Sequence, residues 1–154
     1  MSISEYEKGF IEALIDSEGC LTVGFDKQKT SSNFRIRCLL EITNINLEIL
    51  QKAQKIIGGN ILHKKLNPPR KDVYVLHVGH NNLRKYLPLL DLIVKRRQKE
   101  IVLEVLKNLD GPYGFEAAGR GRKRPEWKEG LFKKFKLEMH QLNQRGKNCT
   151  QKMI

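Results

Sequence analysis

Two carboxylates, Asp16 and Glu18, stand where the first predicted helix ends, and Gly19 follows them. Glycine is the commonest residue just beyond a helix C-terminus. That end of a helix carries partial negative charge and favours Lys, Arg or His, so acids there oppose the helix dipole. Residues that break a local rule without a structural gain are candidates for function. Because carboxylate oxygens suit hard cations, we predict a divalent metal ion at this helix end.

The helix that must position these acids is predicted over residues 4–16. Gly9, Ala13 and Ser17 recur every four residues and give the helix one face of small side chains. A glycine inside a helix costs about 1 kcal/mol relative to alanine, so Gly9 needs a packing reason. Close approach of a second, identical helix would supply one, and packing against the protein's own sheet is an equally weighted alternative.

Alternating and helical patterns continue after this helix. Strands are predicted over residues 20–29, 33–43, 60–66 and 72–79, and helices over 44–57, 82–87 and 89–109. The second strand has one apolar and one polar, partly cationic face, as expected for a sheet buried on one side. The predicted fold class is therefore α+β, in the order α-ββ-α-ββ-α. A last amphipathic helix has one predicted apolar face, made of Trp127, Leu131, Phe135, Met139 and Leu142.

The chain carries a large excess of positive charge. Its 154 residues include 29 Lys and Arg against 17 Asp and Glu, a formal net charge of +12. Residues 119–154 hold 11 basic and 3 acidic residues. This imbalance indicates a polyanionic partner, namely DNA, RNA or an anionic membrane. The arginine-rich run 120–124 is interpreted as a phosphate-contacting arm or a linker.

Other features narrow the class of protein. No apolar run approaches the length of a membrane-spanning helix, and the N-terminus lacks the layout of a signal peptide. Three scattered cysteines give neither a disulfide frame nor a zinc site. We therefore expect an intracellular protein, in a prokaryotic cytoplasm or an organelle, with no membrane partner.

Residues 11–19, Ile-Glu-Ala-Leu-Ile-Asp-Ser-Glu-Gly, resemble the LAGLIDADG motif of homing endonucleases. The α-ββ-α-ββ-α order is similar to that family's core, which has a curved four-stranded antiparallel sheet. A single motif in a chain of this length resembles the homodimeric branch encoded in mobile introns. The resemblance covers about residues 6–109. It implies an endonuclease core over residues 1–110, with a basic linker and C-terminal helix over 111–154 packed on the same domain.

The resemblance implies a role for several motif positions. Glu18, the eighth position, is expected to ligate the metal at the scissile phosphates, beside the backbone carbonyl of Ser17. Asp16 is expected to be a structural and electrostatic partner. Gly9, Ala13, Asp16 and Ser17 are expected at the dimer interface, where symmetry would bring two Glu18 side chains together. Mg²⁺ is the implied cofactor, and Ca²⁺ is expected to bind without supporting cleavage.

Two residues outside the motif are implied as catalytic. Asn44, at the end of the second strand, resembles the polar residue that orients the active-site water network. The alternative is an ordinary helix N-cap. Lys95 resembles the basic residue that stabilises charge on the phosphate, with Arg97 as the next choice in the same run. The alternative for this run is a solvated or phosphate-binding cationic helix end.

The family lays its sheet in the major groove of DNA, which is wide enough for β-ribbons. The resemblance implies DNA contacts from outward strand positions and the first turn, with a merely solvated strand face as the alternative for each. These positions are Thr22, Gly24, Asp26, Gln28, Lys29, Arg35, Arg37, Glu41, His63, Lys65, Val73, Val75 and His77. Outside the strands, Arg97 is also expected to contact DNA. A strand of about nine residues spans roughly 30 Å, so each subunit is expected to cover around nine base pairs.

The residues and the resemblance together predict a homodimeric, Mg²⁺-dependent endonuclease. It is expected to make a double-strand break with short 3′ overhangs in a long pseudo-palindromic DNA site. One alternative is an intron-RNA maturase on the same fold, alone or combined with the nuclease, because a basic C-terminal segment also suits RNA. The other is a DNA-binding regulator without chemistry. Asp16 and Glu18 argue against the regulator, because a pure binder has no use for acids pointed at phosphates.

Overall fold

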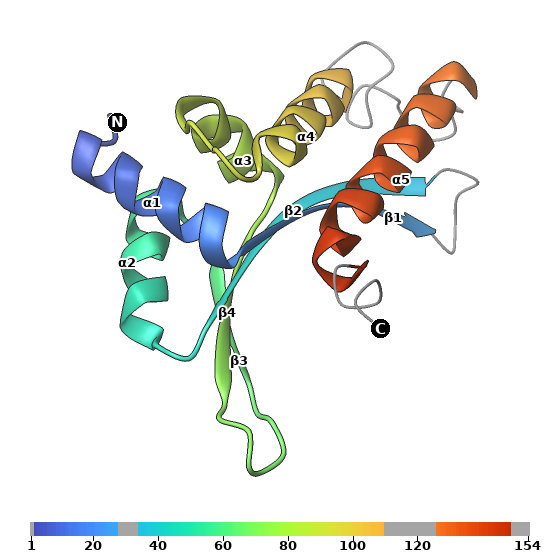
Figure 1. The fold of residues 1–154 in the computed structure, drawn as a ribbon. Coiled ribbons are helices and arrows are strands. Elements are labelled where there is room, and N and C mark those ends of the chain that lie inside the picture. Colours follow the sequence, from blue (N-terminus) through green and yellow to red (C-terminus); the bar gives the residue numbers. More distant parts are fainter. Residues whose placement is uncertain (1, 28–33, 110–125, 149–154) are drawn as a thin grey trace.

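The computed structural model describes residues 2–27, 34–109 and 126–148 of the chain. It confirms the α+β fold class and the predicted order of elements. The elements, drawn in Figure 1, are α1 (Glu5–Glu18), β1 (Gly19–Lys27), β2 (Phe34–Asn44), α2 (Leu47–Ile57), β3 (Asn60–Lys64), β4 (Val73–Val78), α3 (His80–Tyr86), the short 3₁₀ helix η1 (Leu87–Leu89), α4 (Arg96–Leu109) and α5 (Glu126–Asn148).

The four strands form one antiparallel sheet in the order β1-β2-β4-β3, so that β1 and β3 are its edges. Gly19 pairs with Ile42 across β1 and β2, and Leu40 pairs with Val78 across β2 and β4. Since side chains alternate along a strand, this register places one set of apolar residues on the same face. That face is buried and holds Leu21, Val23, Ile36, Cys38, Leu40, Ile42, Leu76 and Val78.

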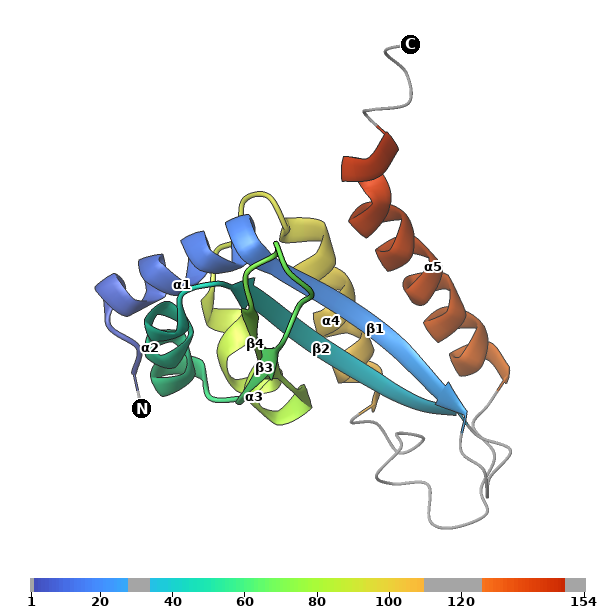
Figure 2. The same cartoon turned by 90° about the horizontal axis from the view of Figure 1, so that it is seen from below.

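Helices pack on the buried face and leave the other one open. Figure 2 looks at β1 and β2 from the uncovered side, where no helix lies across them. Ile11 and Ile15 of α1 and Ile101 of α4 are fully buried against the sheet's apolar residues. Fully burying one such side chain stabilises the fold by about 1.5–3 kcal/mol. The uncovered side is called the open face below, and its residues are given with the candidate site.

Helix α5 uses part of the predicted apolar face, because Phe135, Met139 and Leu142 pack against the core, but the first turns of the helix differ from the prediction. Phe132 and Met139 are buried, whereas Trp127 is 62% exposed. Lys128 is buried on the same side as Phe132. Both Leu131 and Phe132 fit a helical repeat with Phe135 and Met139, so the sequence pattern alone did not separate the two registers. Packing against β1 and α4 selects the larger Phe132, which leaves Trp127 in the first turn facing solvent.

Helix α4 begins later than predicted. The pattern favoured a helix from residue 89, but the segment 90–95 is not helical. In this segment the N–H groups of Ile93 and Lys95 donate hydrogen bonds to the Asp16 carboxylate, at 2.8 and 3.0 Å. Backbone donors held by a carboxylate of another helix are not available for helical hydrogen bonds of their own.

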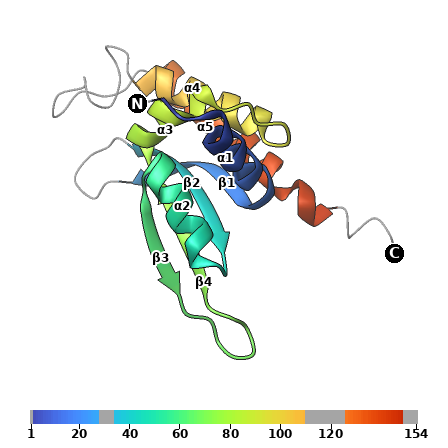
Figure 3. The same cartoon turned by 90° about the vertical axis from the view of Figure 1, so that its left-hand side faces the viewer.

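The hairpin of β3 and β4 extends away from the helical layer, as Figure 3 shows. It leaves α2 through Gly58 and Gly59, whose φ angles of 73° and 101° favour glycine at both positions. Within the ranges that the structure describes, no helix is long and apolar enough to cross a membrane.

Candidate active site at the end of helix α1

Glu18 is the last residue of α1, and its side chain is exposed. Gly19 follows in extended conformation, with φ −78° and ψ 149°, so the expected left-handed helix end is absent here. The glycine is needed for a different reason. A Cβ at this position would lie 2.7 Å from the carbonyl oxygen and 2.9 Å from the Cα of Ile15. Gly19 therefore lets α1 pass straight into β1, which places Glu18 at their junction.

The Asp16 carboxylate holds the segment that precedes α4. Its bonds to the N–H groups of Ile93 and Lys95 place an anion at the N-terminus of that helix, where the helix dipole favours it. Burial alone would raise the pKa of Asp16. Hydrogen bonds from Ile93, Lys95 and Val94 outweigh burial, and the pKa lies below its ordinary value. These contacts agree with the structural role expected for Asp16.

Lys95 supplies the positive charge that the last turn of α1 lacks. Its Nζ atom donates to the carbonyl oxygens of Ile15 at 2.8 Å and Asp16 at 2.6 Å. Burial lowers the pKa of Lys95, and the charges of Asp16, Cys20 and Glu18 oppose this effect only in part. Lys95 is thus half-buried and bound to the end of the helix that bears Glu18. The alternative of a solvated cationic side chain is wrong for Lys95.

Arg97 is engaged elsewhere. Its guanidinium donates to both carboxylate oxygens of Glu138 in α5, at 2.6 and 3.0 Å, and to Glu100 at 3.2 Å. These contacts raise the pKa of Arg97 above its already high ordinary value. The arginine therefore links α4 to α5, and the structure does not present it as a free phosphate-binding group.

A polar stripe of α1 binds the segment before α4. The Lys8 Nζ atom lies 2.9 Å from the Asp91 carboxylate, and Glu12 accepts a hydrogen bond from the Asp91 N–H at 2.6 Å. Together with Asp16, these side chains fix the segment that carries Lys95. Glu12, where the motif has a small apolar residue, therefore has a structural use here that its sequence position did not reveal.

The small side chains of α1 face outward. Gly9, Ala13 and Ser17 are exposed, and a Cβ added to Gly9 would meet no atom within 4 Å. The sheet is instead contacted by Ile11 and Ile15. The alternative that the small face packs against the protein's own sheet is therefore wrong.

Asn44 ends β2 close to the same junction. The register sets it two residues beyond Ile42, the partner of Gly19. Its Oδ1 atom accepts the N–H of Asn46 at 2.8 Å, and Asn46 is the N-cap of α2. Asn44 thus shapes the turn into α2 without being the cap itself. Its catalytic role stays a prediction.

The open face of the sheet brings together many of the predicted DNA contacts. Glu41 and His77 are cross-strand neighbours, with 2.9 Å between Oε1 and Nε2. The two groups are close enough for an ion pair but are not aligned for a hydrogen bond. Thr22 donates to the Leu39 carbonyl at 3.4 Å. By register, the open face holds Cys20, Thr22 and Gly24 of β1, Arg37, Leu39, Glu41 and Thr43 of β2, Asn60, Leu62 and Lys64 of β3, and Val73, Val75 and His77 of β4.

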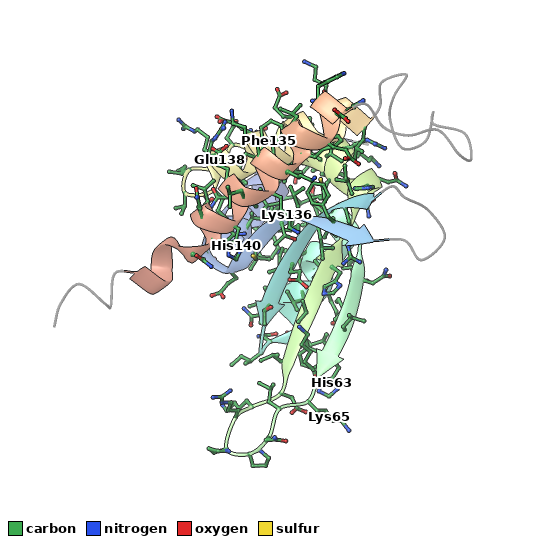
Figure 4. The ribbon with its side chains drawn as sticks, turned by 90° about the vertical axis from the view of Figure 1, so that its right-hand side faces the viewer. His63, Lys65, Phe135, Lys136, Glu138 and His140 are labelled. Carbon is green, nitrogen blue, oxygen red and sulfur yellow. The ribbon has the colours of Figure 1, made fainter. Side chains whose placement is uncertain are left out.

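Two residues of the second hairpin do not lie where they were predicted. His63 pairs with Tyr74 and therefore lies on the side opposite to the open face. Its ring stacks on Tyr74 with 4.9 Å between centroids. Lys65 falls beyond the end of β3, and Figure 4 shows both residues far from the body of the protein. A shift of one residue moves every side chain to the other face, so Leu62 and Lys64 occupy the predicted places.

Val75 is on the open face but is only 1% exposed. Thr43 and Leu62 are its partners on the two neighbouring strands, and cross-strand neighbours of this kind crowd a short aliphatic side chain. The expectation that Val75 contacts bases is therefore wrong for this conformation. Asp26 and Arg35 pair in the β1–β2 register. Gln28, Lys29 and the run 120–124 lie outside the described residues.

One chain offers part of a metal site. Among residues 2–27, 34–109 and 126–148, no cluster of three or more His, Cys, Asp or Glu could hold an ion. Glu18 has an exposed carboxylate, and the Ser17 carbonyl lies in the last turn of α1, where carbonyls lack helical partners. Both are hard oxygen ligands of the kind that Mg²⁺ prefers. Two ligands are too few, because Mg²⁺ is coordinated by about six oxygen atoms. These two ligands do not by themselves complete the coordination of an ion.

No protein-family model matches the sequence, and no curated protein matches it significantly. Solved structures do match. The archaeal intron-encoded homing endonuclease I-Vdi141I, complexed with DNA, has a TM-score of 0.55 and 23% identity, covering 86% of this chain and 98% of that one. The homing endonuclease I-TnaI has a TM-score of 0.65 and 16% identity, covering 94% and 96%. I-CvuI, in complex with its target and 2 mM Ca, has a TM-score of 0.54 and 22% identity, covering 89% and 98%.

At these identities, what is shared is the arrangement of helices and strands. The matches extend over nearly the full length of all three proteins. Two further matching structures are described as LAGLIDADG homing endonucleases in complex with target DNA. The chain therefore has the fold of the LAGLIDADG homing endonucleases.

Proposed function

We propose that this protein is a site-specific DNA endonuclease of the homing type, which hydrolyses phosphodiester bonds with Mg²⁺. The observation that carries the proposal is the joint position of Glu18 and Lys95. The exposed Glu18 carboxylate and the Lys95 ammonium group both lie at the end of α1, at the margin of an open sheet face. A sheet face of this kind fits the major groove, and the acid–base pair would then lie at the DNA backbone.

Each group has a distinct part in the proposed reaction. Glu18, with the Ser17 carbonyl, would hold Mg²⁺ at the phosphate. The bound ion would activate water and offset negative charge in the transition state. Lys95 keeps an ammonium group at a fixed position without reorganisation, and this favours stabilisation of the charge that develops on the phosphate. Asn44 is proposed to orient water at the same junction.

We further propose that two chains act together. Glu18 and Ser17 of one chain supply too few ligands, and the small face of α1 is free to contact a second α1. A two-fold axis along that face would bring both Glu18 residues to neighbouring phosphates of the two strands. Such a dimer would cut both strands of a long pseudo-palindromic site. Small residues permit the close helix approach that this arrangement needs.

Two other functions make different predictions. A maturase would bind its host intron RNA and promote splicing, with or without DNA cleavage. A regulator would bind DNA without cutting it. The exposed Glu18 carboxylate favours the nuclease over the regulator, because an unpaired acid near phosphates weakens binding unless a cation lies between them.

The proposal is tested with purified protein and a plasmid that carries the target site. For a homing endonuclease, this is the site in the host gene where the intron inserts, in its intron-free form. We expect linear plasmid with Mg²⁺, and binding without cleavage with Ca²⁺. Glu18→Gln should abolish cleavage while the Kd for the site stays within about tenfold of wild type. Binding by the wild type without linearisation in Mg²⁺ would support the regulator instead.

Glu104→Gln is the matched control. Glu104 is an exposed glutamate on α4, outside the candidate site, so its amide variant should cleave as the wild type does. If Glu18→Gln and Glu104→Gln cleave equally well, Glu18 has no role in the reaction. Splicing of host intron RNA by the protein, measured in a separate reaction, identifies a maturase.

A further inference from the structure

Helix α5 borders the open face of the sheet. Strand β1 is the edge of the sheet on that side, and Asn143 of α5 donates from Nδ2 to the Leu21 carbonyl of β1 at 2.9 Å. Phe132 and Met139 anchor the helix in the core. In Figure 2, α5 lies alongside β1, beyond its outer edge. Side chains on the β1 flank of α5 therefore lie along the outer edge of β1, the strand that bounds the open face.

The β1 flank of α5 carries two lysines. The Lys136 Nζ atom stands 5.2 Å from the centre of the Phe25 ring, so Lys136 lies on the side of the helix toward β1. Phe25 shares the helix-covered face of β1 with Leu21 and Val23. Lys133 precedes Lys136 by one helical turn and shares its side of the helix. Both lysines are exposed. Figure 4 shows Lys136 and His140 on the side of α5 toward the sheet, with Glu138 on the far side.

Lys134 lies on the opposite flank. It neighbours Glu138, whose pKa is lowered first by the hydrogen bond from Arg97 and also by the charge of Lys134. The Arg97–Glu138 pair joins α5 to α4, so this flank faces away from β1. Lys134 is also exposed. The helix thus offers a lysine of equal charge and similar exposure that does not border the open face.

We propose that Lys133 and Lys136 bind the phosphate backbone of a duplex that lies on the open face. This inference rests on the proposed function. A sheet inserted in the major groove has a phosphate backbone along each of its sides, so cations beyond an edge strand meet phosphates and not base edges. Helix α5 would therefore add affinity without sequence preference and widen the protein's footprint past β1.

The experiment measures binding of the full chain to a random duplex of about 30 base pairs, in EDTA, over a series of NaCl concentrations. Each phosphate contact contributes about 0.9 to the slope of log K against log salt. The double variant Lys133→Gln, Lys136→Gln should lose nearly 2 from the wild-type slope and bind roughly tenfold or more weakly at physiological salt. Lys134→Gln should keep the wild-type slope.

Lys136→Arg separates charge from packing. It keeps the cation and its contact with the Phe25 ring, so its slope should equal that of the wild type. The melting temperature of each variant shows whether the helix remains folded. A wild-type slope in the double variant, or an equal loss in Lys134→Gln, would overturn the proposal.

A duplex RNA of the same sequence identifies the partner. If the double substitution weakens binding to RNA more than binding to DNA, the surface serves RNA and the assignment to DNA is wrong. The measurement needs neither metal nor a cleavage site. Absence of cleavage by the wild type would therefore contradict the proposed function, while the salt slopes still decide the role of α5.

Discussion

At the scale of single residues, Asp16 and Glu18 are close in sequence but have different surroundings. The Asp16 carboxylate is occupied by backbone N–H groups of the segment before α4, whereas Glu18 is exposed at the helix end. Only Glu18 can approach a cation without giving up hydrogen bonds of the fold. The structure thus separates an acid that is bound to the fold from an acid that is exposed, and the proposed chemistry uses the exposed one.

Asp16→Asn should lower the free energy of unfolding at neutral pH by about 1–2 kcal/mol, because hydrogen bonds to a charged acceptor are lost. The folded-state pKa of Asp16 lies below its ordinary value of 3.8. Its contribution is therefore complete above the unfolded pKa and is lost as the pH falls through the folded pKa. Urea unfolding from about pH 7 to about pH 3 should show the two proteins converging at the acid end. An equal difference at both ends contradicts this account.

Lys95→Arg tests the ammonium group through the pH dependence of cleavage. Since the pKa of Lys95 lies below its ordinary value of 10.5, wild-type cleavage should decline on the alkaline side at a lower pH than an ordinary lysine would give. Arginine stays charged throughout, so the variant should be slower near neutral pH but lose less rate on the alkaline side. Single-turnover rates from about pH 7 to about pH 9.5 provide the measurement. Identical alkaline profiles would exclude Lys95 as the titrating group.

At the scale of elements, the junction of α1 and β1 depends on close backbone approach. Gly19→Ala places a Cβ 2.7 Å from the Ile15 carbonyl oxygen, so the backbone must shift. We expect a loss of about 1–3 kcal/mol in the free energy of unfolding, as for other overpacked sites. Gly24→Ala in the same strand is the control, because its Cβ would meet its nearest atom at 3.8 Å. Urea unfolding of both variants should show a loss much larger for Gly19→Ala.

Sequence periodicity was sufficient for elements with strong alternation and insufficient for contacts between distant segments. The face of β2 followed from its alternation of apolar and polar residues. The start of α4 could not be predicted from periodicity. It depends on the hydrogen bond between Asp16 and Lys95, which are 79 residues apart. His63 was placed on the wrong face because β3 is mostly exposed and gives no apolar alternation from which to read its register. Lys95 was predicted as catalytic from the family resemblance, but its bonds to α1 carbonyls were not.

At the scale of the whole molecule, charge and symmetry act together. The formal net charge of +12 attracts any nucleic acid, so charge alone cannot restrict cleavage to one site. In the proposed dimer, each open face would read one half-site and two chains would be needed to complete the metal site, and both requirements would restrict cleavage. Under this proposal, cleavage of both strands would depend on the small face of α1.

Gly9→Leu tests that dependence without touching the candidate site. Gly9 is exposed in mid-helix and no atom lies within 4 Å of an added Cβ, so leucine should keep or raise the stability of the monomer. It should prevent close approach of a second α1, and sedimentation should show monomers where the wild type forms dimers. Cleavage of both strands should then fall by at least about a hundredfold, because a separated monomer would hold only half of the proposed metal site. Gly130→Ala in α5 is the control. A Cβ added at Gly130 would also meet no atom within 4 Å, so this variant should change neither assembly nor cleavage. A Gly9→Leu protein that remains dimeric and active would show that the chains associate through another surface.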